Sequence, residues 1–138
     1  PQLLVGATLG LRMSPQGLKI DAQKINFICL GAAMSVIANT PKPPYFAVIF
    51  TSTRTAGDHG YDAVAHRMLE LAAQQSGFLG VESATQEIGI TVSYWADMDS
   101  IKHWKANAEH VQAQTAGRKF WYQDFKVRIA KVERDYGL

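Results

Sequence analysis

The stretch from Ile88 to Trp95 is the feature that most restricts how this chain can fold. It reads Ile-Gly-Ile-Thr-Val-Ser-Tyr-Trp, an alternation of apolar and polar residues that is typical of a strand with one buried face. Runs of β-branched and aromatic residues predict further strands at 45–53, at 78–83 and within 120–132. Apolar residues at helical spacing predict one helix at 61–75 and a second from Asp97 or Asp99 to Gly117. The predicted order is therefore β-α-β-β-α-β.

This order predicts an α+β fold of the ferredoxin-like type. Two split β-α-β units form a four-stranded antiparallel sheet with both helices on one face. The other face would then expose large apolar side chains, although each of them contributes about 1.5–3 kcal/mol when it is buried. We therefore expect a homodimer in which two sheets pack face to face.

The chain divides by composition into two parts. Residues 1–44 form an N-terminal extension that ends in a linker with Pro41, Pro43 and Pro44, and residues 45–138 form the domain. Met34 is the candidate natural start, which would make residues 1–33 an upstream extension. A signal peptide is the alternative, because Lys24 precedes an apolar run at 25–38. The stretch 2–11 is a candidate extra strand.

Charge and cysteine content exclude several classes of protein. The chain has 14 Lys and Arg against 12 Asp and Glu, and the basic excess lies before residue 45, so the domain offers no basic face for nucleic acid. The apolar run at 25–38 is shorter than the roughly 20 residues of a membrane-spanning helix. Cys29 is the only cysteine, which excludes an intrachain disulfide. We expect a cytoplasmic protein that binds neither nucleic acid nor membrane.

Standard cofactor and catalytic motifs are absent from the sequence. It contains no Gly-x-Gly-x-x-Gly, no phosphate-binding loop, no His-Glu-x-x-His and no Gly-x-Ser-x-Gly. Flavin, nicotinamide and ATP are therefore not supported, and we expect no cofactor.

The predicted second helix carries two stripes of chemically different residues. The apolar stripe consists of Ile101, Trp104, Ala108 and Val111, and the polar stripe consists of His103, Asn107, His110 and Gln114. On a continuous helix His103 and His110 lie on one face about 10 Å apart, too far to share a metal ion. His110 is a candidate proton carrier. Trp104 is either a core residue or the wall of a pocket for a planar substrate.

Other residues are candidates for binding a substrate. Arg54 and His59 flank a glycine-containing loop at a strand end, a suitable place for a pocket rim. Arg118 follows Gly117 and is a candidate for holding an anionic oxygen. For these residues simple exposure to solvent is the alternative. Tyr94 and Trp121 are either packing residues or part of a pocket.

The domain resembles a known family in several segments between Tyr45 and Tyr136. These segments are Tyr45-Phe-Ala-Val-Ile-Phe-Thr-Ser, Gly57-Asp-His-Gly-Tyr, Gly77-Phe-Leu-Gly-Val-Glu-Ser, Ile90-Thr-Val-Ser-Tyr-Trp, Trp104-Lys, Ala108-Glu-His, Gly117-Arg, Trp121-Tyr and Ala130-Lys-Val-Glu-Arg. They are similar to the antibiotic biosynthesis monooxygenase family. The resemblance implies a dimeric α/β barrel of ferredoxin-like subunits. Some members oxidise polycyclic phenols with O₂ and no cofactor, and others degrade haem.

The haem-degrading branch matches this sequence less well. That branch uses an Asn on the first strand, a Trp on the second helix and a His about ten residues later. Trp104 matches the Trp, but the first-strand position falls near Ser52 or Thr53, and Gln114 stands at the later position. The sequence therefore lacks the expected axial iron ligand.

The resemblance to the cofactor-free branch leads to a hypothesis for the site. His110 would act as the base, Trp104 as the flat wall, and Asn107 or Arg118 as oxyanion donors for a small aromatic or phenolic substrate. Further candidates for substrate binding are Ser52, Arg54, His59, Tyr94, His103, Arg118 and Trp121, and no metal ligand is expected. The alternative is a non-catalytic, small-molecule-binding or stress-associated dimer of the same fold.

Overall fold

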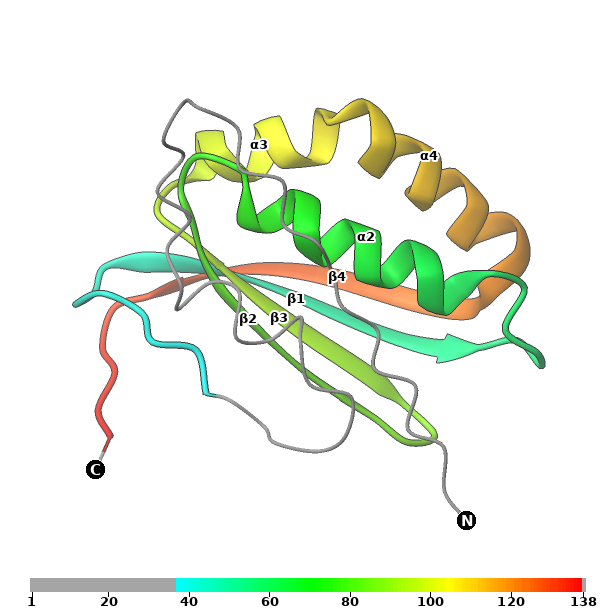
Figure 1. The fold of residues 1–138 in the computed structure, drawn as a ribbon. Coiled ribbons are helices and arrows are strands. Elements are labelled where there is room, and N and C mark those ends of the chain that lie inside the picture. Colours follow the sequence, from blue (N-terminus) through cyan, green and yellow to red (C-terminus); the bar gives the residue numbers. More distant parts are fainter. Residues whose placement is uncertain (1–36, 138) are drawn as a thin grey trace, which may run out of the picture.

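A computed structural model describes residues 37–137, in which helices cover one face of an antiparallel sheet (Figure 1). The strands are β1 (Tyr45–Arg54), β2 (Phe78–Thr85), β3 (Gly89–Trp95) and β4 (Tyr122–Val132). The helices are α2 (Tyr61–Ala73), α3 (Met98–Ala106) and α4 (Ala108–Ala116), followed by a π-helical turn, η1 (Gly117–Trp121). The strand order is β2-β3-β1-β4. The predicted ferredoxin-like α+β fold is confirmed.

Several predictions concern residues outside the described part of the chain. These are the extension 1–33, the start at Met34, the candidate strand at 2–11 and the signal-peptide alternative. Within residues 37–137 no helix is long and apolar enough to cross a membrane.

The register of β1 decides which side chains face the helices. β1 is central and pairs antiparallel with β3 and β4, so that Phe46 lies opposite Trp95 and Val48 lies opposite Ile129. Phe46 and Val48 pack on the core below the helices. Alternation then turns Phe50, Ser52 and Arg54 toward the same side.

The core forms where α2 and α3 meet β2 and β3. Its buried members are Ala72, Phe78, Trp95 and Ile101, and Trp104 packs against them. Trp95 has no exposed surface, and its indole N–H donates to the hydroxyl of Ser93 (2.9 Å). This hydrogen bond satisfies the indole donor inside the core.

The face of the sheet away from the helices is partly covered by the chain itself. Tyr45 and Ala47 lie on this face and are each only 5% exposed. The segment before β1 contacts this end, since the backbone N–H of Ala38 donates to Glu82 (2.8 Å) and Thr40 bonds the hydroxyl of Tyr45 (3.1 Å). The expectation of a fully bare face is therefore wrong at this end. Towards the β2–β3 turn, Ile90 is 44% exposed.

The predicted second helix is broken, which corrects its proposed stripes. Asn107 has an extended ψ of 130°, so α3 ends before it and α4 begins after it. Its side-chain oxygen accepts from the backbone N–H groups of Glu109 and His110, which replaces the helical bonds lost at the break. His103 and His110 therefore do not share one helical face.

The ends of α2 and α3 are held by different groups. α2 ends at Ala73 with Gln74 as its cap, and Gly77 is a turn residue with φ of +77° before β2. Gly60 occupies the N-cap position of α2. Asp58 accepts from the N–H groups of Gly60 and Asp62 (2.8 and 3.1 Å). Asp97 caps α3 by accepting from Ser100 N–H (2.7 Å).

Candidate active site

His110 lies flat on Trp104 beneath the start of α4. The ring centroids are 4.1 Å apart and the planes differ by 11°. The Nδ1 atom of His110 lies 2.9 Å from the backbone oxygen of Trp104. Stacking and this hydrogen bond together fix the position of the imidazole.

The hydrogen bond also determines the tautomer of His110. A carbonyl oxygen only accepts, so Nδ1 must carry the proton and the neutral ring keeps its lone pair on Nε2. Burial lowers the pKa of His110, and the bond to Trp104 opposes this effect only in part. The imidazole is therefore neutral near pH 7 and chemically suited to accept a proton at Nε2.

Asn107 caps the helix that carries His110. Its side-chain oxygen accepts from the N–H of Glu109 at 3.1 Å and of His110 at 3.2 Å. These bonds fix the first turn of α4. A donor to an oxyanion would be the side-chain NH₂ of Asn107, so its role as an oxyanion donor stays a prediction. A second bond joins the two helices across the break, because Gln114 of α4 donates to the backbone oxygen of Lys105 in α3 (3.1 Å).

Trp104 contacts two aromatic neighbours. His110 stacks on its ring, and Trp95 lies near-parallel to Trp104 with centroids 6.2 Å apart and planes 25° apart. Trp104 therefore supports His110, and its role as the wall of a pocket stays a prediction.

A second group of candidate residues lies at the far end of β1. The guanidinium carbon of Arg54 is 3.4 Å from the ring centroid of Tyr61, the first residue of α2. Tyr61 makes edge contacts with Trp121 (5.6 Å) and Tyr122 (6.0 Å). Trp121 is buried and donates its indole N–H to the backbone oxygen of His59 (2.9 Å). Sequence analysis did not include Tyr61; the signal that marks it is an aromatic residue directly after the glycine loop.

Ser52 belongs to this second group by position. It is 6% exposed, and its neighbours across the strands are Gly89 and Phe125. Phe125 in turn packs on Phe50 and Tyr122 with centroids 5.7 and 6.0 Å apart. Burial is the main cause that raises the pKa of Tyr122 above its usual range, and its neighbour Tyr61 adds to this.

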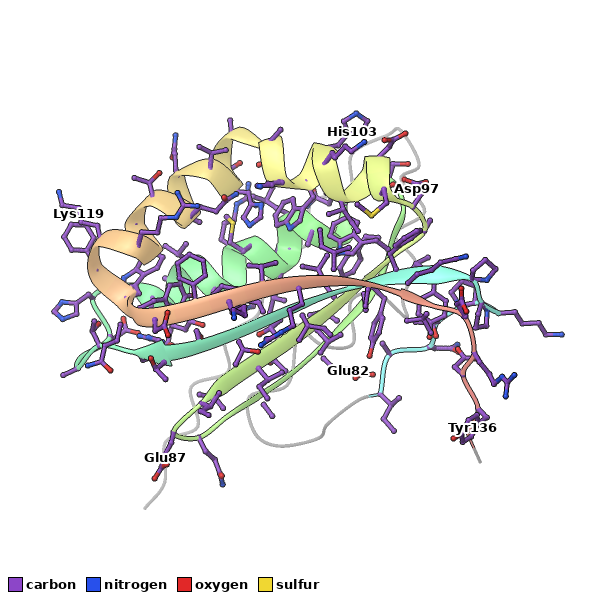
Figure 2. All side chains as sticks on the ribbon, turned by 180° about the vertical axis from the view of Figure 1, so that it is seen from behind. Glu82, Glu87, Asp97, His103, Lys119 and Tyr136 are labelled. Carbon is purple, nitrogen blue, oxygen red and sulfur yellow. The ribbon has the colours of Figure 1, made fainter. Side chains whose placement is uncertain are left out.

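The side chains of the remaining predicted site residues are not brought together with either group. His103 and Arg118 are exposed, and Figure 2 shows His103 pointing away from the sheet. His59 is exposed, and its ring bonds back to Ala56 within its own loop (3.0 Å). Tyr94 lies on the face away from the helices, where it donates to Glu82 (3.1 Å). Burial there, with the charge of Glu82, raises the pKa of Tyr94 to about 12.

An apolar strip of β4 connects the two ends of the helix-covered side. Phe125, Val127 and Ile129 alternate on this side, and 36%, 49% and 47% of their surfaces are exposed. They remain open because α4 packs mainly against α2, α3 and η1. A shallow hollow of about 120 Å³ near the β2–β3 turn is lined by Thr51, Ser52, Thr53, Ile88, Asp124, Phe125, Lys126 and Arg128. Among residues 37–137 no cluster of His, Cys, Asp and Glu is arranged to hold a metal ion.

Comparison with known proteins gives one strong sequence match and a consistent set of folds. The chain is 52% identical over 103 residues to the uncharacterized protein YqjZ of Bacillus subtilis, covering 73% of this chain and 90% of that protein. No family model matches.

Solved structures share the fold at low identity. SnoaB of Streptomyces nogalater, a cofactor-independent oxygenase, has a TM-score of 0.59 at 14% identity, over 67% of this chain and 97% of SnoaB. Rv0793 of Mycobacterium tuberculosis has a TM-score of 0.60 at 7% identity, over 67% and 99%. A Nitrosomonas europaea protein, provisionally assigned as an antibiotic biosynthesis monooxygenase, has a TM-score of 0.56 at 9% identity, over 67% and 92%.

Proposed function

The chain belongs to the same family as YqjZ of Bacillus subtilis, and from this premise we propose that it is a cofactor-independent monooxygenase acting on a small aromatic or phenolic substrate. The shared fold with SnoaB, an oxygenase that needs no cofactor, supports the reaction class. The residues of this chain supply the specific argument, which rests on His110.

The proposal rests on one observation: the imidazole of His110 is neutral and is fixed in position by a hydrogen bond. Its Nδ1–H is bound to the backbone oxygen of Trp104, and its pKa is lowered by burial. A base of this kind is effective near neutral pH because it is unprotonated and already oriented. Residues of the strip on β4, such as Val127 and Ile129, offer an apolar surface for a flat substrate on the same side of the sheet.

The chemistry required of the protein is limited. His110 Nε2 takes a proton from an acidic C–H or O–H of an anthrone or hydroquinone, which leaves an electron-rich carbanion or phenolate. This anion reduces O₂ directly: for an anthrone, one oxygen atom enters the ring as the quinone carbonyl and the other leaves as water, with all electrons supplied by the substrate. The protein holds the anion, keeps water away and returns the proton.

A homodimer is part of this proposal. Among residues 37–137, the segment before β1 covers the sheet face away from the helices at one end, and Ile49, Ile90 and Val92 lie beyond that end. Packing two such faces together would remove these side chains from water.

A non-catalytic binding dimer is the second candidate, and the environment of Trp104 favours it. This indole stacks with His110 and Trp95 and packs with the buried core, an arrangement that also serves stability alone. The two candidates can be told apart because only the monooxygenase would turn over a substrate.

Oxygen consumption with 1,8-dihydroxyanthrone tests the proposal. We expect the protein to accelerate O₂ uptake, and His110→Gln to reduce the rate about 10²- to 10⁴-fold, the usual contribution of a general base. His66→Gln is the matched control, since His66 is exposed on α2 and bonds only Glu70 (3.5 Å). Binding of the anthrone without faster O₂ uptake would support the binding dimer and refute the enzyme.

A further inference from the structure

Arg54 carries a positive charge that the described part of the chain leaves without a counter-ion. Its guanidinium stacks on Tyr61, but no carboxylate of residues 37–137 forms an ion pair with it. Its Nε atom is buried and has no hydrogen-bond partner among the described residues. Buried donors are nearly always bonded, so the described residues satisfy this guanidinium only in part.

The backbone around Arg54 is specialised. The register between β1 and β4 shifts between Thr53 and Arg54, which sets Arg54 opposite Tyr122. Such bulges redirect a side chain and are frequent beside binding sites. In the following loop His59 adopts a positive φ of 49°, rare for a residue with a Cβ. Its backbone oxygen holds the indole of Trp121 (2.9 Å). The strained loop thereby fixes one wall of the cluster.

The cluster also offers neutral donors and aromatic surface. Tyr122 lies opposite Arg54, and burial raises its pKa so that its hydroxyl keeps its proton at physiological pH. Ser52, two residues before Arg54 on the same side of β1, is buried. Phe125 packs on Phe50 and Tyr122 and is 36% exposed, which leaves the cluster accessible from β4.

We propose that the Arg54 cluster, formed by Arg54, Tyr61, Tyr122, Ser52 and Phe125, binds a small aromatic carboxylate. The planar fork of an arginine matches the two oxygens of a carboxylate, and its two terminal nitrogens form such a fork without the buried Nε. A hydroxyl of Tyr122 or Ser52 completes the shell of the carboxylate. The aromatic ring of the ligand lies along Phe125 and its neighbours.

This site is distinct from the one at His110. Val48 and Trp104 pack against the same core cluster, and Arg54 lies six residues beyond Val48 along β1, a separation of about 20 Å at the rise of a strand. The inference goes beyond the proposed oxygenase activity and does not depend on it. Loss of one function therefore leaves the other measurable.

Titration with 2-naphthoate tests the inference, with the neutral 2-naphthamide as its isostere. We expect 2-naphthoate to quench tryptophan fluorescence and to raise the melting temperature, and 2-naphthamide to bind at least about tenfold more weakly, because it lacks the charge. Arg54→Gln should weaken 2-naphthoate binding about tenfold or more, and Arg54→Lys several-fold, because lysine keeps the charge without the fork. Arg134→Gln removes the same charge from an exposed position and should bind as the original chain does.

Three results would overturn the inference. They are no binding of 2-naphthoate, equal binding of naphthoate and naphthamide, or unchanged binding by a folded Arg54→Gln variant. Circular dichroism establishes folding of each variant; if Arg54→Gln does not fold, Arg54→Lys and the naphthamide comparison decide. The His110→Gln variant should bind 2-naphthoate as the original chain does. Binding at the Arg54 cluster is thereby tested independently of the proposed oxygenase activity.

Discussion

The backbone of Gly77 lies directly against the side chain of Ser100. A Cβ atom placed on Gly77 would clash with Ser100 Oγ and lie 2.7 Å from Ser100 Cβ. Gly77 also has a φ of +77°, and its carbonyl oxygen accepts from Ala96 N–H (2.7 Å). This contact joins the turn before β2 to the first turn of α3, and only glycine allows it.

Gly77→Ala should therefore be strongly destabilising. We expect a loss of about 2–4 kcal/mol in the free energy of unfolding, the sum of an unfavourable φ and an overpacked contact. Gly60→Ala is the control, because Gly60 has a similar φ of +79° but no atom within 4 Å of the added Cβ. It should lose only the backbone part, about 1–2 kcal/mol. Urea denaturation measures both, and equal losses would show that the Ser100 contact is unimportant.

Asn107→Ala should destabilise the chain and disturb His110. The variant removes the acceptor for two N–H groups at the start of α4, which costs about 1 kcal/mol. Asn107→Ser keeps a capping oxygen and should recover most of the stability. Chemical denaturation gives the energies, and O₂ uptake reports on His110. If Asn107→Ala retains full oxygenase rate, positioning of His110 by this cap is refuted.

Stability should fall as the pH drops through the range in which His110 titrates. The unfolded chain protonates this imidazole near pH 6.5, whereas burial lowers its pKa in the folded state. Below about pH 6.5 the unfolded state therefore binds more protons, and the free energy of unfolding decreases as the pH is lowered. The contribution is present in full above that pH.

Melting temperatures between about pH 5 and pH 8 measure this effect. His110→Gln should show a shallower decrease toward acid than the original chain. The exposed His103, replaced by Gln, should retain the original slope. Identical profiles for all three proteins would contradict a buried, neutral His110.

The proposed dimer can be assigned to one face of the sheet by two matched substitutions. Ile90 lies on the face away from the helices and is 44% exposed, whereas Val127 lies on the helix side and is 49% exposed. Ile90→Lys should convert a dimer to monomers in light scattering, because it places a charge in the interface. Val127→Lys should leave the dimer intact. The reverse outcome would assign the interface to the helix side of β4.

Local patterns in the sequence were enough to predict the elements and their order. The alternation from Ile88 to Trp95 has the period of a strand, and the stripe through Ile101 and Trp104 has the period of a helix. The start of this helix near Asp97 was also predicted, because acidic residues favour the first turn.

The break at Asn107 was harder to predict from the sequence, because the apolar stripe continues across it. Because of this break, His110 stacks on the ring of Trp104 and does not share a helical face with His103. The pairing of Arg54 with Tyr61 and Tyr122 likewise depends on a bulge in the register of two strands distant in sequence. The sequence by itself determined the α+β fold, because periodicity is local. Only the tertiary structure decided which side chains form each site, because the stacking of His110 on Trp104 and the register of β1 against β4 do not follow from that periodicity.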